Sequence, residues 1–130
     1  LLDEGMDAGC KGISFGLGYR PGNFFTDDQI RQMVSRRCLI GLNYYTRFLR
    51  EDGQPELGDL MRHIDHFLAL GAENCLALGS DFDGADLPQF LSSPTKAAGL
   101  YGELAERYGT ALCDQLFYGN TMRFFEENLG

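Results

Sequence analysis

The feature that most constrains the fold is a set of three short apolar segments separated by helical patterns. Each segment is continuously apolar rather than alternating, as in strands of a parallel sheet whose two faces are both covered. An order in which strands alternate with helices predicts parallel strands joined by helical crossovers. We therefore predict an α/β fold with about three parallel strands and flanking helices. The predicted strands are Gly12 to Leu17, Cys38 to Tyr44 and Cys75 to Ser80.

Local signals at helix ends place helices between and after these strands. Thr26 and Gln29 have the spacing of a capping box, in which each side chain accepts a hydrogen bond from the backbone of the other residue. Ser93 is followed by Pro94, a typical cap and first helical residue. The signals predict helices starting at Thr26, after Pro55 and at Ser93, ends at Gly71 and before Gly109, and further helices capped by Thr110 and Asn120.

Charge and cysteine content exclude several classes of protein. The formal charge of −8 repels phosphates and anionic lipids, so we expect neither a nucleic acid nor a membrane partner. No apolar run approaches the ~20 residues of a membrane-spanning helix. The four cysteines contain no C-x-x-C pair, so we interpret them as buried free thiols of a cytoplasmic protein. They are Cys10, Cys38, Cys75 and Cys113.

An acidic turn directly follows the last predicted strand. Asp81 and Asp83 flank Phe82, and Asp86 comes shortly after. Because active sites of parallel α/β folds lie at the carboxyl ends of strands, Asp81 is a candidate acid, base or metal ligand. The three carboxylates together could bind a divalent cation, since hard oxygen ligands suit such ions. The alternative is that one Asp caps the turn and the others are solvated.

Two further groups of residues invite a functional interpretation. His63 and His66 are three residues apart on the second predicted helix, a spacing compatible with a shared metal. We favour structural or solvated roles for them, because metal sites of α/β folds gather at the strand ends. Arg20 follows the first predicted strand in a glycine-rich loop, and its planar guanidinium is a candidate binder of a substrate carboxylate.

From about Thr26 to the C-terminus the sequence resembles the last third of the membrane (renal) dipeptidase family, metal-dependent enzymes of the amidohydrolase-type barrel. The resemblance implies a partial (β/α) barrel in a single domain over residues 1–130. It also implies that Asp81 handles protons beside a two-zinc centre during dipeptide hydrolysis, and that the paired histidines are not metal ligands. The matching stretches are Thr26–Ile30, Ile40–Tyr45, His63–His66, Gly79–Gly84 and Tyr118–Asn120.

The first 25 residues look more like a strand and loop of N-acyl-D-amino-acid deacylases, which suggests a mixed origin. The family's His-x-Asp pair, its bridging Glu and its two later ligand histidines have no counterpart here, so we assign no metal ligand to this chain. The abrupt start within helix-like sequence at Leu1 suggests a piece of something longer. We expect dipeptide hydrolysis only when a second copy or missing barrel parts complete the site; an inactive structural or chimeric fragment that self-associates is the alternative.

Overall fold

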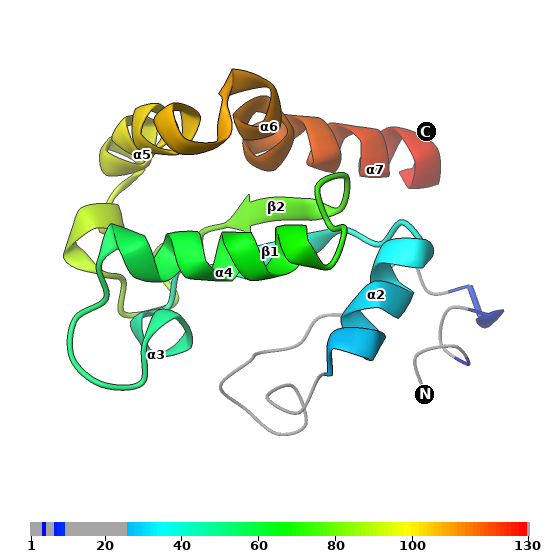
Figure 1. Ribbon diagram of the computed structural model, residues 1–130, viewed down its shortest axis with the longest axis horizontal. Helices are drawn as coiled ribbons and strands as arrows, with labels where there is room; N and C mark the ends of the chain where they lie inside the picture. Colours follow the sequence, from blue (N-terminus) through cyan, green and yellow to red (C-terminus); the bar gives the residue numbers. More distant parts are fainter. Residues whose placement is uncertain (1–3, 5–6, 10–25, 130) are drawn as a thin grey trace.

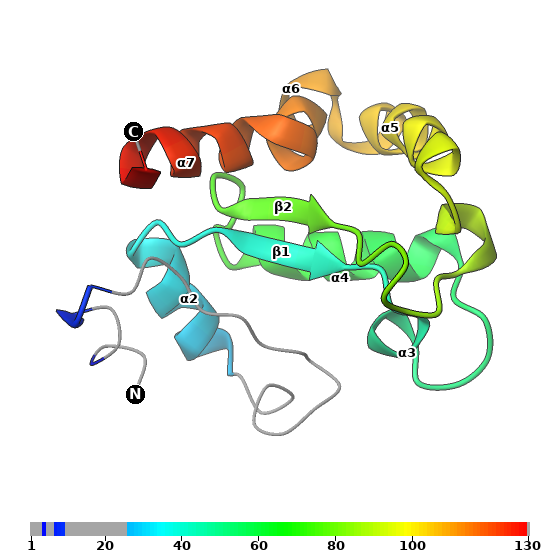
Figure 2. The same cartoon turned by 180° about the vertical axis from the view of Figure 1, so that it is seen from behind.

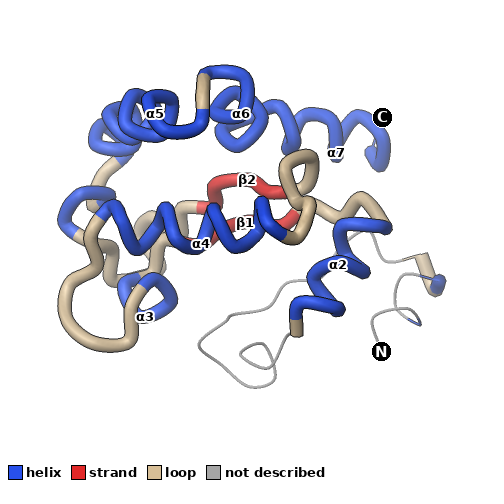
Figure 3. The backbone as a smooth tube through the Cα atoms, viewed as in Figure 1, coloured by secondary structure: helices blue, strands red, loops and turns tan. Residues whose placement is uncertain are grey.

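The fold is a mixed α/β arrangement, mostly helical, around a small parallel sheet (Figure 1). The computed structural model describes residues 4, 7–9 and 26–129. The predicted strand over residues 12–17 lies outside the described residues. Helices far outweigh strands along the described chain, as the tube in Figure 3 makes clear.

The elements follow the alternating order that the sequence predicts. In chain order they are α2 (Asp27–Ser35), β1 (Ile40–Asn43), α3 (Thr46–Leu49), α4 (Leu57–Ala69), β2 (Leu76–Gly79), the short 3₁₀ helix η2 (Gln89–Leu91), α5 (Pro94–Tyr108), α6 (Thr110–Asp114), the π-helical turn η3 (Gln115–Gly119) and α7 (Asn120–Leu129).

The sheet consists of β1 and β2, which pair in parallel with Ile40 opposite Leu76 and Asn43 opposite Gly79. Helix α4 lies across one face of the sheet, and α5, α6 and α7 run along its β2 side (Figures 1 and 2). Because side chains alternate between the two faces of a strand, Ile40, Leu42 and Leu76 share one face, and all three belong to the buried core. The opposite face carries Gly41, Asn43, Ala77 and Gly79.

The predicted helix ends are confirmed where they depend on local chemistry. The Gln29 amide donates to Thr26 Oγ1 over 3.3 Å and the Thr26 amide donates to Gln29 Oε1 over 2.9 Å, which completes the capping box. Ser93 Oγ accepts from the Lys96 amide at the start of α5. Gly71 ends α4 with a φ of +81°, a conformation that favours glycine.

The predicted caps Thr110 and Asn120 are wrong. Gly109 precedes α6 without any side-chain cap bond, and the chain stays helical from Thr110 through η3 into α7. Asn120 has right-handed helical angles and a buried side chain, whose Nδ2 donates to the carbonyls of Glu73 and Leu76 over 2.9 and 2.7 Å. Its amide therefore binds the carbonyl of the first residue of β2 and that of Glu73, in the turn before β2, instead of capping a helix. Sequence spacing does not reveal these distant partners.

Three of the four cysteines fall within the described chain, and the thiol prediction is confirmed for them. Cys38, Cys75 and Cys113 are buried and free. Burial raises the pKa of each thiol, which keeps it neutral and weakly nucleophilic. The described helices include none long and apolar enough to cross a membrane.

A buried carboxylate joins the start of α4 to the end of α3. Asp59 is 2% exposed and accepts the Glu56 amide over 2.7 Å. It also pairs with Arg62 and, over 3.6 Å, with Arg50. The hydrogen bond from the Glu56 amide, followed by the bond and charge of Arg62, holds the pKa of Asp59 below its usual 3.8 although burial opposes this. The ionised side chain therefore stabilises the folded chain.

Replacement of the Asp59 carboxylate should make the free energy of unfolding depend less on pH in the acidic range. Because the folded-state pKa of Asp59 lies below its usual 3.8, its contribution is complete above about pH 5 and is lost as the pH falls past 3.8 and through the folded-state pKa. We expect Asp59→Asn to lower the free energy of unfolding at pH 7 by about 1–3 kcal/mol and to flatten its decline between pH 5 and 3. Urea unfolding at several pH values measures both, and the exposed Asp28→Asn is the matched control. Equal losses in the two variants would contradict the assignment.

Candidate active site at the carboxyl ends of the strands

The parallel pairing of β1 and β2 brings the ends of both strands to one edge of the sheet. Asn43 is the last residue of β1, and Asp81 follows the end of β2 by two residues. The segments after these strands are also tied together, because the Thr46 amide and hydroxyl both donate to the Asp86 carbonyl, over 2.9 and 2.8 Å. Asn43, Asp81 and the segments that follow the two strands therefore lie close together at this edge of the sheet.

The Asp81 carboxylate is held by Asn43. Asn43 Nδ2 donates to Asp81 Oδ2 over 3.0 Å, and Asn43 Oδ1 accepts the Tyr45 amide over 2.7 Å. The backbone bond fixes which end of the amide faces the carboxylate, because only the oxygen can accept from Tyr45. Asp81 is exposed, so one carboxylate oxygen is oriented while the side chain stays accessible.

The turn that carries Asp81 has an unusual backbone. Asp81 and Asp83 have φ values of +63° and +66°, in the left-handed region that Asp tolerates better than most residues. A Cβ on Gly84 would come within 2.6 Å of Asp81 Oδ1. Glycine at this position therefore leaves the space that the carboxylate occupies.

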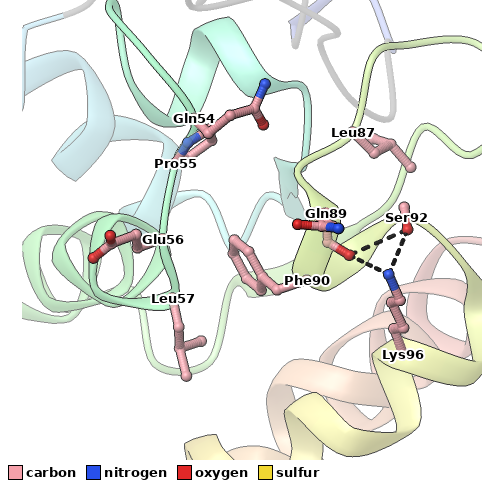
Figure 4. Close-up of a pocket in the computed structure, with 9 residues that line it drawn as sticks. All are labelled: Gln54, Pro55, Glu56, Leu57, Leu87, Gln89, Phe90, Ser92 and Lys96. Atoms are coloured by element: carbon pink, nitrogen blue, oxygen red, sulfur yellow. Dashed lines mark hydrogen bonds between the residues drawn. The ribbon is translucent and has the colours of Figure 1, made fainter.

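Several hollows lie along the loops at this end of the described chain, and two of them bear on the site. The hollow beside Asp81 has a volume of about 430 Å³ and is lined by both turn aspartates, Asp86 and the rings of Tyr45 and Phe48. Figure 4 shows the second, of about 850 Å³, between the loop before α4 and the segment around η2. In this second hollow Lys96 donates hydrogen bonds to the Gln89 carbonyl and to Ser92 Oγ. Two of the three N–H donors of its ammonium group are therefore used within the protein.

The described residues contain no group of three His, Cys, Asp or Glu side chains that could hold a metal ion. Asp81, Asp83 and Asp86 share a hollow without forming such a group. A two-zinc centre needs several histidine and carboxylate ligands, so the described part of the chain does not fit one.

The two histidines have separate structural partners. His63 Nε2 lies 3.1 Å from the Leu49 carbonyl, and His66 Nε2 lies 3.2 Å from Asp27 Oδ1 on α2. These contacts agree with the structural interpretation of both side chains. Arg20 lies outside the described residues, so its role as a carboxylate binder stays a prediction.

Asn43 is the functional candidate that the sequence interpretation missed. The available signal was a polar residue that closes a continuously apolar strand, since such residues at the carboxyl end of a parallel strand face the site edge. The predicted strand from Cys38 to Tyr44 includes Asn43 without distinguishing it from its apolar neighbours. Its importance depends on the register that sets it beside Asp81, which the sequence alone does not specify.

Parallel strands with an oriented acid at their carboxyl ends place the chain among α/β proteins whose sites lie at strand ends. Comparison with known proteins narrows this class. The membrane dipeptidase family (peptidase family M19) matches residues 20–129, and the chain belongs to this family.

The chain is also similar to individual proteins and solved structures. An uncharacterized protein in the pqqA 5′ region of Klebsiella pneumoniae is 35% identical over an alignment of 103 residues, and the match covers 75% of this chain and 38% of that protein. Two solved structures are each 31% identical with a TM-score of 0.74: a dipeptidase AC of family M19, and a metallopeptidase from Rhodobacter sphaeroides bound to a phosphinate mimic of L-Ala-D-Ala. Each match covers 80% of this chain and 32% or 31% of the solved chain, so this chain spans about a third of their length.

The space left by Gly84 can be tested directly. In Gly84→Ala the new methyl group should displace the Asp81 carboxylate, so that the Asn43 side-chain amide signal in ¹H–¹⁵N spectra moves toward its position in Asp81→Ala. The matched control is Gly102→Ala on α5, where a Cβ meets nothing within 4 Å. An Asn43 signal that is unchanged in Gly84→Ala would show that the carboxylate does not occupy this space.

Proposed function

We propose that this chain supplies one part of a dipeptidase-like metallohydrolase, in which Asp81 transfers protons during hydrolysis of a dipeptide. The observation that carries the proposal is the position of Asp81, oriented by Asn43 at the carboxyl end of a parallel strand, within a segment that matches the dipeptidase family. The chain spans about a third of its solved relatives, so the activity belongs to a completed fold.

The open face of the sheet supports a partial (β/α) barrel in one domain over residues 1–130. Strands of parallel sheets are normally covered on both faces. Here α4 covers one face, while Figure 2 shows both strands with no described helix in front of the other. On that face Gly41 is exposed, Asn43 and Gly79 are half-buried, and Ala77 is buried. Such a face fits the interior side of a barrel wall, which further strands would enclose.

The chemistry of this chain centres on one carboxyl group. In the intact family we expect two zinc ions to activate the attacking water; the described residues do not form their site. Asn43 holds Asp81 Oδ2, which leaves Oδ1 to exchange a proton with a reacting group in the adjoining hollow. Arg20 is proposed to bind the substrate carboxylate through its planar guanidinium.

The proposal also covers the origin of the first residues, the cellular setting and the partners of the chain. Residues 1–25 are proposed to derive from a deacylase-like barrel, although the dipeptidase match begins at residue 20 and reaches into this segment. The buried free thiols support a reducing, cytoplasmic setting. A second copy or the missing barrel parts would complete the site, and a substrate dipeptide is the expected small-molecule partner.

A chimeric dipeptidase tests the role of Asp81. Residues 20–129 of this chain would replace the matching segment of the Rhodobacter sphaeroides metallopeptidase, and zinc-dependent hydrolysis of L-Ala-D-Ala would be measured. We expect the isolated chain to show no turnover and the chimera to be active. Asp81→Asn should lower kcat by about 10²–10⁴-fold, because a general acid or base is lost.

The matched control is Asp83→Asn, a carboxylate that lines the same hollow and should change kcat less than threefold. If a folded chimera kept more than a tenth of its activity after Asp81→Asn, the proposed role would be wrong. If the folded chimera had no activity at all, the alternative of an inactive structural or chimeric fragment would be favoured.

A further inference from the structure

The large apolar side chains that are exposed among the described residues all lie on η3 and α7. Tyr118 is 61% exposed, Met122 50%, Phe125 46% and Leu129 70%. Successive spacings of four, three and four residues place such side chains along one side of a helix. These four residues are called here the α7 apolar stripe.

Contacts on another side of α7 fix the orientation of the helix. The buried Asn120 amide binds two carbonyls at the start of β2, and Arg123 Nη2 donates to the Asn74 carbonyl over 2.6 Å. Glu127 pairs with Arg123 over 2.8 Å and with Arg37, beyond the end of α2, over 2.6 Å. These polar contacts face the body of the molecule. The stripe therefore cannot turn inward without breaking them.

The area of the stripe argues against a second copy as its partner. A large aromatic side chain can bury on the order of 200 Å², so four side chains that are about half exposed offer roughly 400 Å². Two copies would bury about 800 Å², which is below the ~1,200 Å² of stable specific interfaces. The net charge of −8 on each chain adds repulsion between copies.

The part of the family fold that this chain does not cover is a better candidate partner for the stripe than a second copy. The chain matches its solved relatives with a TM-score of 0.74 but covers only 32% and 31% of their length. We propose that the α7 apolar stripe is the docking surface for the remainder of the dipeptidase fold, an apolar helix or strand face from outside the matched segment. This inference rests on the proposed partial barrel, but it concerns assembly and does not depend on hydrolysis.

The chimeric dipeptidase tests the stripe through its thermal unfolding midpoint. Phe125→Glu should lower the midpoint of the chimera by about 10 °C, because a buried unpaired charge is strongly destabilising. The same substitution should shift the isolated chain by less than about 2 °C, since surface substitutions change stability little. Ala98→Glu, at an exposed position of α5, is the control and should leave both proteins unchanged. Equal small shifts in chimera and isolated chain would overturn the proposal.

Two further measurements decide the question even if the chimera does not fold. In the solved Rhodobacter sphaeroides structure, the positions aligned with the stripe should be apolar and packed against residues outside the matched segment. Solvent or a second subunit at those positions would overturn the proposal.

Sedimentation of the isolated chain should show a monomer at micromolar concentration. A tight dimer that Phe125→Glu dissociates would overturn the proposal, because it would identify a second copy as the occupant of the stripe. If the chimera did not hydrolyse the dipeptide but Phe125→Glu still lowered its unfolding midpoint, the proposed function would be refuted and the docking proposal would stand.

Discussion

The parallel pairing of β1 with β2 is the constraint on which the rest of the structure depends. It brings Asn43 and Asp81 to one edge, where a single hydrogen bond orients the carboxylate. It also leaves one face of the sheet covered by α4 and the other lined by glycine, alanine and asparagine. The register of the two strands therefore sets both the position of the candidate site and the small side chains of the second face.

The parts of the fold that local chemistry determines could be predicted from the sequence. The capping box of Thr26 and Gln29, the stop at Gly71 and the cap at Ser93 depend on residues a few positions apart. The end of a buried strand likewise pointed to Asp81. Asn120 was misjudged because its partners, the carbonyls of Glu73 and Leu76, lie more than 40 residues away.

The candidate site shows the same division between local and distant information. Alternating aspartates after an apolar run predict the turn from the sequence. The role of Asn43 in orienting Asp81 can be recognised only from the strand register. The need for glycine at position 84 can be recognised only from the position of the Asp81 side chain. The metal ligands that a dipeptidase needs are not found among the described residues, which contain no group of three His, Cys, Asp or Glu side chains that could hold a metal ion. From the sequence, no metal ligand is assigned to this chain.

The buried amide of Asn120 has a consequence for the C-terminal helix as a whole. By accepting hydrogen bonds from that amide, the carbonyls of Glu73 and Leu76 become dependent on a residue of α7. A chain shortened before Asn120 would leave both carbonyls without this donor at the point where β2 begins. Helix α7 thus supports the strand that leads to Asp81, and a truncation within this helix would weaken the backbone that precedes the Asp81 turn.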